Sequence, residues 1–158
     1  MMELKGYGAA MRRASFLGMN CSIARSLEQI GDWWTLLIVR DAQLGITRFD
    51  DFQRSLGISR NTLTNRLAAL VEHGVLTRAA APGSSRERYV LTEKGRDLWQ
   101  VVMMIRQWGD RWVTPPGEEP VVLDHVDCRH EITAELTCSA CREVLEPSAL
   151  RARPGPGA

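Results

Sequence analysis

The chain has 158 residues, 44% of them hydrophobic, and its formal net charge at pH 7 is only +1. A chain of this length suits one domain with an appendage, and its apolar content suffices for a hydrophobic core. Its longest apolar runs are far shorter than the roughly 20 residues that a membrane helix requires, and its N-terminus carries no apolar stretch followed by a cleavage site. We therefore expect a small cytoplasmic protein without a membrane partner.

Charge is distributed unevenly along the chain. Residues 47–96 carry nine Lys or Arg and five acidic residues, a net charge of +4, whereas residues 115–158 carry four Arg and eight acidic residues, a net charge of −4. The acidic C-terminal segment cancels the basic central segment in the whole-chain sum. A local positive field of this kind attracts phosphate groups.

The N-terminal part is predicted to hold an arm and two scaffold helices. Residues 1–20 have no clear periodicity and are interpreted as the arm, whereas apolar residues recur at helical spacing over residues 22–30 and 33–43. The residues expected to face inward are Ile23, Leu27, Ile30, Trp34, Leu37, Ile38 and Leu44.

Cys21 stands at the start of the first predicted helix. A thiol at this place can have a lowered pKa, because free amide hydrogens and the helix dipole favour the thiolate. Cys21 is therefore a candidate redox sensor, and a small buried hydrophobic role is the alternative.

A helix-turn-helix is predicted from residue 49 onward. Gly57 can adopt the positive φ that ends a helix, and Ser59 can accept the first free amide hydrogens of the next helix. The two helices therefore meet across a turn of three or four residues, which is the arrangement that aims a second helix at a DNA groove.

The helix expected from Ser59 to His73 has two different faces. Its apolar residues form one buried stripe, namely Leu63, Leu67, Leu70 and Val71. On the opposite face, Asn can pair bidentately with adenine, Thr can contact base edges, and Arg suits phosphates. The candidate DNA-binding residues are Ser59, Arg60, Asn61, Thr62, Thr64, Asn65 and Arg66. An ordinary solvated helix face is the alternative.

Residues 75–80 and 86–91 are predicted to form two short strands joined by a turn that contains Pro and Gly. Such a hairpin projects as a wing, and its Arg side chains can reach an adjacent minor groove or the DNA backbone. The candidate DNA-binding residues of the wing are Arg78, Arg86 and Arg88. A solvated hairpin is the alternative.

Over residues 21–112 the chain resembles the HxlR-type regulators within the wider MarR-like winged-helix group. The resemblance rests on Cys21 opening a helix and on the segments IGDWWTLLIVR (30–40), RFDDF (48–52), ISRNTLTNRL (58–67) and YVLTEKG (89–95). The wing departs from the family pattern because it lacks an acidic, Pro-rich tip. The resemblance implies a cytoplasmic dimer that binds a roughly palindromic operator and is released by a small-molecule or redox signal. It also implies thiol sensing at the position of Cys21.

A long helix is predicted to begin near Thr92, and its apolar residues cover more than one face. One face can pack on its own domain, and the other most simply packs on the same helix of a second subunit across a twofold axis. The expected interface residues are Leu98, Val101, Val102, Ile105, Trp108 and Trp112. The recognition helices of such a dimer should lie about 34 to 36 Å apart. Complete burial within one chain is the alternative.

After a linker rich in Pro and Glu, residues 115–150 are predicted to form a small C-terminal module that holds three of the four cysteines. Two short-spaced pairs match the ligand pattern of a zinc ribbon: His125 with Cys128, and Cys138 with Cys141. His130 is an alternative ligand. One structural zinc per chain would fold a module whose apolar core is small.

Two metal-free interpretations of this module remain open: a pair of buried thiols, or a redox switch of Cys138 and Cys141. No other cofactor is expected. Residues 151–158 are predicted to be disordered.

The predicted fold is therefore α+β and mainly helical. It comprises a winged helix-turn-helix over residues 21–114, with a long C-terminal dimerisation helix, and the small cysteine-containing module. The predicted function is a dimeric, sequence-specific DNA-binding transcriptional regulator, and repression is the simplest mode because a compact dimer can occlude a promoter. An enzyme is not expected, because Cys138 and Cys141 lack a βαβ context and no phosphate loop or nucleophile elbow occurs. The alternatives are a winged-helix protein-protein interaction module and a thiol redox protein that uses Cys138 and Cys141.

Overall fold

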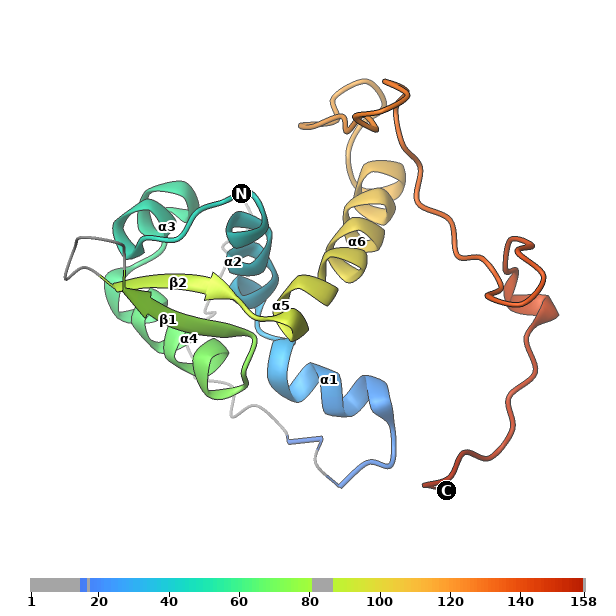
Figure 1. The fold of residues 1–158 in the computed structure, drawn as a ribbon, viewed down its shortest axis with the longest axis horizontal. Helices are drawn as coiled ribbons and strands as arrows, with labels where there is room; N and C mark the ends of the chain where they lie inside the picture. Colours follow the sequence, from blue (N-terminus) through green and yellow to red (C-terminus); the bar gives the residue numbers. More distant parts are fainter. Residues whose placement is uncertain (1–14, 17, 81–86, 158) are drawn as a thin grey trace, which may run out of the picture.

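The computed structural model describes residues 15–16, 18–80 and 87–157. Its elements, in chain order, are α1 (Ser22–Ile30), α2 (Trp33–Gln43), α3 (Phe49–Leu56), α4 (Arg60–Glu72), β1 (Leu76–Ala80), β2 (Glu87–Leu91), α5 (Glu93–Asp97), α6 (Trp99–Trp112) and the short 3-10 helix η1 (Pro147–Ala149). Figure 1 shows the α2–α4 helices and the hairpin gathered on one side, with α6 and the C-terminal segment extending away from them. The architecture is a mainly helical α+β winged helix, as predicted.

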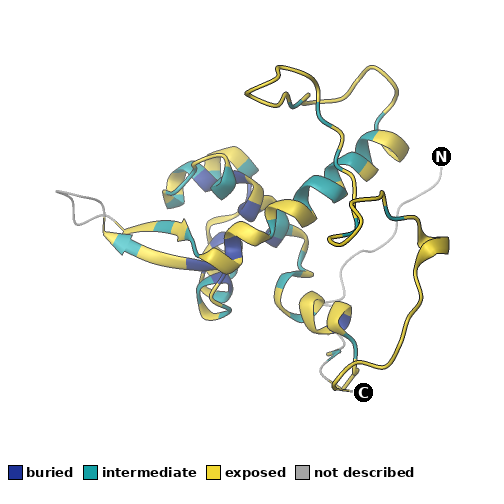
Figure 2. Ribbon diagram, turned by 45° about the vertical axis from the view of Figure 1, so that its right-hand side comes forward, coloured by how far each residue is buried: buried dark blue, intermediate teal, exposed yellow. Residues whose placement is uncertain are grey.

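The hydrophobic core lies where α2, α3, α4 and the start of β1 meet, which is the dark-blue region of Figure 2. The predicted stripe of α4 is at its centre, because Leu63, Leu67 and Leu70 are at most 1% exposed. Phe52 of α3 and Ile38 of α2 are fully buried against this stripe. The core therefore holds the two helices of the helix-turn-helix in one fixed arrangement.

The turn between α3 and α4 follows the local signals in the sequence. Gly57 has φ 61° and ψ 20°, the left-handed conformation that glycine adopts at little cost. The Ser59 hydroxyl accepts the amide hydrogen of Thr62 at 3.2 Å and so caps α4. Helix α4 is one residue shorter at each end than the predicted range, because Ser59 and His73 are its caps.

The strands β1 and β2 pair antiparallel, in a register that runs from Leu76 opposite Leu91 to Ala80 opposite Glu87. Strand β1 is one residue shorter at its N-terminal end than predicted, and β2 ends at Leu91 as predicted, whereas the predicted start of β2 at residue 86 lies outside the described residues. The Tyr89 amide donates to the carbonyl of Thr47 at 2.8 Å, which ties β2 to the segment before α3. The connection between the strands lies outside the described residues.

The prediction of one long helix from Thr92 is wrong, because α5 and α6 are separate helices that meet at Leu98. Thr92 caps α5: its hydroxyl accepts the amide hydrogen of Gly95 at 3.1 Å and donates to the carbonyl of Gly74 at 2.6 Å. The Lys94 ammonium donates to the carbonyl of His73 at 2.8 Å. These hydrogen bonds attach α5 to the C-terminal end of α4. Because the two helices are separated at Leu98, α6 can run in a different direction from α5.

The expected burial of the first two helices is only partly correct. Ile38 is buried, and Ile30 and Trp34 are half-buried, but Ile23 is 71% exposed and Leu44 is 74% exposed. Leu27 and Leu37 are also exposed, at 42% and 37%, and Ala24 is the buried residue of α1. Periodicity predicts that the apolar residues of α1 share one side of the helix. It does not predict which part of the protein, if any, packs against that side.

The C-terminal segment beyond α6 consists of loops, two tight turns and η1, and Figure 1 shows it lying beside α6 and beyond it. The isolated bridges of this segment join Asp124 to Glu131 and Thr137 to Val144. None of the helices in the described part of the chain combines the length and apolar character needed to cross a membrane.

Candidate nucleic-acid interface and C-terminal cysteine turns

The outer face of α4 presents two side-chain amides, those of Asn61 and Asn65. Both side chains are exposed, and neither has a hydrogen-bond partner among the described residues. They stand one turn apart on the helix, and the exposed Ala68 continues the same face with a small side chain. This face therefore offers donors and acceptors to an external partner and lets that partner approach closely.

The hydroxyls of α4 are used within the helix. Thr62 Oγ1 lies 2.8 Å from Ser59 Oγ, and Thr64 Oγ1 donates to the carbonyl of Arg60 at 2.9 Å. Their bonding capacity is partly taken up, so the amides of Asn61 and Asn65 are the polar groups of this face with the most capacity left for a partner.

The two arginines of α4 have different environments. The Arg60 guanidinium lies 4.7 Å from the ring centroid of Phe49 and 3.8 Å from the Asp50 carboxylate, and its side chain is 73% exposed. Arg66 is half-buried, and its Nη2 lies 2.9 Å from Oδ2 of Asp32. Arg60 can reach an external phosphate, whereas Arg66 ties α4 to the start of α2.

Asp32 is the residue of this surface that the sequence analysis missed. Its other carboxylate oxygen accepts the amide hydrogen of Trp34 at 3.1 Å, so Asp32 caps α2 while it pairs with Arg66. An acidic residue before a predicted helix is a recognisable cap signal. The ion pair with a residue 34 positions away has no such local signal.

The wing arginines lie on opposite faces of the hairpin. In the strand register Arg78 is opposite Tyr89, whereas Arg88 is opposite Ala79. Arg78 lies 4.0 Å from the carboxylate of Glu87 and 6.0 Å from the Tyr89 ring centroid. Arg88 is exposed and has no partner among the described residues, so it is the wing cation most available to a phosphate. Arg86 lies outside the described residues.

Helix α6 has no fully buried residue, and Figure 2 shows it in the intermediate and exposed colours alone. Four apolar residues, which we call the α6 stripe, follow one another at helical spacing and are 39%, 50%, 60% and 65% exposed: Val101, Ile105, Trp108 and Trp112. Leu98 and Val102, which were also expected in an interface, pack against the core of their own chain.

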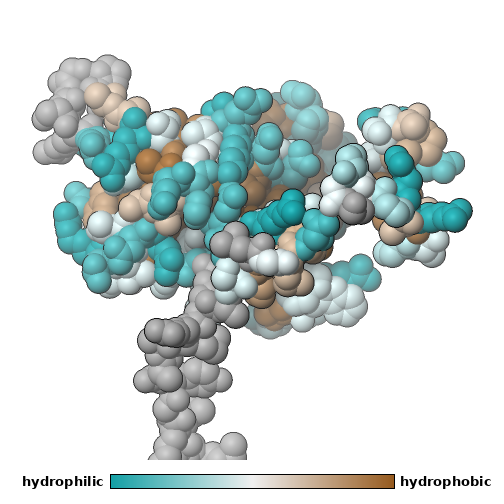
Figure 3. Space-filling view, turned by 90° about the horizontal axis from the view of Figure 1, so that it is seen from below, coloured by the Kyte–Doolittle hydropathy of each residue, from teal (hydrophilic) through white to brown (hydrophobic). Residues whose placement is uncertain are grey.

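The α6 stripe borders an open, mainly apolar groove of about 450 Å³, whose lining includes Met104 of α6 and Leu136 of the C-terminal segment. Figure 3 shows, on another view of the surface, brown apolar patches between the hydrophilic side chains. Apolar surface of this kind, left open on one chain, is typical of a protein-protein contact.

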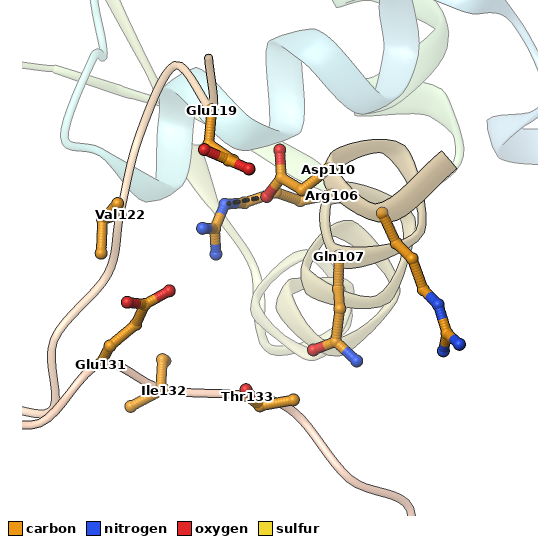
Figure 4. A pocket seen from close by; sticks show the side chains of 9 residues that line it. Arg106, Gln107, Asp110, Glu119, Val122, Glu131, Ile132 and Thr133 are labelled. Carbon is orange, nitrogen blue, oxygen red and sulfur yellow. Dashed lines mark ion pairs between the residues drawn. The ribbon is translucent and has the colours of Figure 1, made fainter. Parts of the chain in front are cut away.

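The remaining side of α6 holds the C-terminal segment. The Gln107 amide donates to the carbonyl of Ala134 at 3.1 Å and accepts the Ala134 amide hydrogen at 2.8 Å. Arg106 pairs with Asp110 at 3.3 Å and donates to the carbonyl of Val121 at 2.7 Å. Figure 4 shows these α6 side chains facing the loop residues across a polar pocket of about 390 Å³.

All four cysteines are free thiols. Cys21 is half-buried at the N-cap of α1, and its side chain makes no capping hydrogen bond. Hydrogen bonds from the backbone amides of Cys141 and Ala140 to the sulfur lower the pKa of the Cys138 thiol, because they stabilise the thiolate. The sulfur of Cys128 lies 3.3 Å from Nδ1 of His125.

The four expected zinc ligands are placed as two pairs, one on each tight turn of the C-terminal segment. Within the described ranges no three His, Cys, Asp or Glu side chains come together closely enough to hold a metal ion. His130 lies at the closing end of the first turn, where its carbonyl accepts the His125 amide hydrogen at 2.9 Å.

Comparison with known proteins shows that the chain is similar to transcriptional regulators. Residues 29–116 match the family model described as HxlR-like helix-turn-helix. An HTH-type transcriptional regulator of Mycobacterium tuberculosis is 42% identical over 139 residues, which cover 86% of this chain and 87% of that relative.

Solved structures give the same result. The crystal structure of PA1607, a proposed transcription factor, is 39% identical with a TM-score of 0.81, and covers 89% of this chain and 99% of its own. The redox regulator HypR in its reduced form is 28% identical with a TM-score of 0.53, and the match covers 58% of this chain and 92% of HypR. These relatives identify a transcriptional regulator rather than an enzyme.

Proposed function

The chain belongs to the HxlR-like helix-turn-helix family of transcriptional regulators, and on this basis we propose that it is a dimeric repressor whose helix α4 reads an inverted-repeat operator. The observation that carries the proposal is the pair of exposed amides of Asn61 and Asn65, which have no partner among the described residues. An Asn amide is the side chain best suited to bidentate pairing with adenine in the major groove.

Three features support base reading by α4 over an ordinary solvated face. The helix begins at a capped, exposed N-terminus, where positive dipole charge favours phosphate. Ala68 keeps its outer face narrow. The Asp32–Arg66 ion pair and the buried leucines of α4 hold the helix rigidly, which favours specific recognition because little orientation has to be fixed on binding.

The arginines that remain available are suited to the DNA backbone. Arg60 lies beside the start of α4, and Arg88 lies on the outer face of the wing. Phosphate contacts of this kind position the protein without selecting a sequence, and they make binding sensitive to salt because counterions are released.

Dimer formation is supported by apolar surface left open on two helices. The α6 stripe is one such surface, and on α1 Ile23 is exposed as well. A twofold pairing of two chains would cover equivalent patches on both, and an inverted repeat in DNA has the same symmetry.

The signal proposed is oxidation of Cys21. HypR is a redox regulator, and Cys21 is a free, half-buried thiol at the start of α1. Peroxide oxidises a thiolate to a sulfenic acid and is itself reduced to water. A polar group formed beside the exposed apolar face of α1 would disturb a contact made there.

The proposed DNA binding is tested first by selection of genomic fragments with the purified protein, followed by affinity measurements on the best fragment. Asn61→Ala and Asn65→Ala should each weaken specific binding at least about fivefold, because each removes a bidentate contact in both subunits. Asn20→Ala is the matched control and should bind like the wild type, because Asn20 lies before α1 and bonds to Arg25.

Salt dependence separates backbone contacts from base reading. Arg88→Ala should reduce the slope of log affinity against log salt by about 2 for the dimer, whereas Arg153→Ala in the tail should leave it unchanged. If no sequence is enriched at low salt, with or without reductant and zinc, the regulator is not acting through specific DNA binding. A reporter whose output falls when the gene is deleted would contradict repression.

The proposed signal is tested in the same assay. Hydrogen peroxide should lower operator affinity at least about tenfold for the wild type, and Cys21→Ser should abolish this response because it removes the oxidisable sulfur. Ser22→Ala, at the exposed position that follows Cys21, serves as the control and should respond like the wild type because it keeps the thiol. Full release of the Cys21→Ser variant by peroxide would exclude Cys21 as the sensor.

A further inference from the structure

Two tight turns of the C-terminal segment have the same backbone hydrogen bonds, at positions that differ by 13 in the sequence. In the first turn the His125 amide donates to the carbonyl of His130 at 2.9 Å. In the second the Cys138 amide donates to the carbonyl of Glu143 at 2.8 Å. Each turn is therefore closed over six residues by one backbone bond.

The inner bond of the two turns is also repeated. The Arg129 amide donates to the carbonyl of His125 at 2.7 Å, and the Arg142 amide donates to that of Cys138 at 2.9 Å. Arg129 has φ 58° and Arg142 has φ 65°, and they are the non-glycine residues of the described chain with positive φ. This conformation is unfavourable for a side chain with a Cβ, so its occurrence at the same place in both turns indicates a shared requirement.

The first and fourth residues of each turn are potential ligands for a soft metal. In the first turn Nδ1 of His125 lies 3.3 Å from the sulfur of Cys128. In the second turn Cys138 and Cys141 occupy the equivalent positions within the same two backbone hydrogen bonds. Each turn therefore carries a pair of nitrogen or sulfur ligands on the same backbone geometry.

We propose that the two turns together bind one zinc ion through His125, Cys128, Cys138 and Cys141. This set supplies four nitrogen and sulfur ligands, the number that a structural zinc site requires. Each of the three thiols releases its proton to solvent on binding. Three thiolates and a neutral imidazole around Zn²⁺ give a net charge of −1.

The repeat distinguishes between the two histidines. His125 occupies the place in the first turn that Cys138 occupies in the second, whereas His130 corresponds to Glu143. His125 is therefore the ligand. The repeat also explains why an arginine follows each pair: Arg129 and Arg142 place positive charge next to the thiolates, where it offsets the negative charge of the site.

Binding requires the second turn to move onto the first, since the two pairs are separate in the described structure. Two hydrogen bonds of Gln107 hold Ala134, in the short connection between the turns, on α6, and Arg106 holds Val121, which precedes the first turn. Leu136, which follows Ala134, lines the groove beside the α6 stripe. Zinc would therefore order the segment that borders the proposed dimer surface. The zinc site does not depend on the proposed DNA binding.

The test uses the full chain, purified under reducing conditions and analysed for metal by mass spectrometry. We expect about one zinc per chain. After exchange with Co²⁺, the spectrum should show thiolate-to-cobalt charge transfer and the intense visible bands of a tetrahedral site. Cys128→Ser, Cys138→Ser and His125→Ala should each lower the zinc content at least about fivefold, because each removes a ligand. Cys21→Ser and His130→Ala are the matched controls and should retain the metal.

Three results would overturn the proposal. The first is a wild-type protein that takes up no zinc when Zn²⁺ is added under reducing conditions, although circular dichroism shows that the chain is folded. The second is a Cys138–Cys141 disulfide that persists under reductant and excludes metal. The third is zinc content that falls with His130→Ala and not with His125→Ala, which would contradict the ligand assignment. The cobalt spectrum of the wild type tests the site even if a variant fails to fold.

Discussion

At the scale of single residues, Gly95 shows how a small side chain fixes the arrangement of larger elements. It is buried in the middle of α5, and a Cβ there would collide with the carbonyl oxygen of Val75 and lie 2.9 Å from Cδ2 of Leu91. Because the first of these atoms belongs to the backbone, it cannot turn aside as a flexible side chain can. The close approach of α5 to the backbone just before β1 therefore requires glycine.

We expect Gly95→Ala to lower the free energy of unfolding by about 2 kcal/mol or more, because the added methyl group forces the backbone of β1 or α5 to shift. Gly109→Ala is the matched control, since no atom lies within 4 Å of a Cβ at that helical position. It should be neutral or stabilise the protein by up to about 1 kcal/mol. Urea denaturation of both variants checks this, and equal midpoints would contradict the packing described.

Other residues show why sequence reasoning succeeded or failed. Gly57 and Ser59 were placed correctly because their roles depend on adjacent backbone groups. Arg66 was expected to contact phosphate, and that prediction is untested; its ion pair with Asp32 was missed, because no local pattern indicates a partner so far away in the chain. Long-range pairing depends on tertiary structure, which a single sequence does not reveal.

At the scale of elements, α6 divides its apolar residues between two neighbours. Val102, with Leu98 just before the helix, packs on the core of its own chain, whereas the α6 stripe remains exposed. The sequence predicts a helix that is apolar on more than one face, but periodicity alone placed Leu98 and Val102 in the interface. The direction of α6 depends on the break at Leu98, and this break decides which face is inward.

We expect Ile105→Glu to shift the protein from dimer to monomer at micromolar concentration, because it places a charge in the middle of the α6 stripe. Ser55→Glu adds the same charge at an exposed position of α3, away from the α6 stripe and its groove, and it should leave the dimer intact. Sedimentation velocity measures both. A wild-type protein that is monomeric throughout, or an Ile105→Glu variant that remains dimeric, would contradict pairing through this face.

At the scale of the whole molecule, the basic and the acidic parts of the sequence form different parts of the fold. The basic part of the sequence, residues 47–96, forms the helix-turn-helix, the wing and α5, whereas the acidic part, residues 115–158, forms the segment beyond α6. The fold class and most element bounds followed from periodicity and turn chemistry. The course of the C-terminal segment did not, because its few apolar residues and scattered turns leave its contacts with α6 undetermined.

The location of the core also sets an order for folding. Among the described residues, the buried core cluster lies entirely between Ile38 and Leu76, so the contacts that form the cluster close short loops at small entropic cost. During synthesis this cluster can form before β2, α5 and α6 have emerged, and these later elements then complete it. Association of two chains would come last, as a step whose rate depends on concentration, so the chain can reach its native fold well before it acquires the symmetry that an inverted repeat requires.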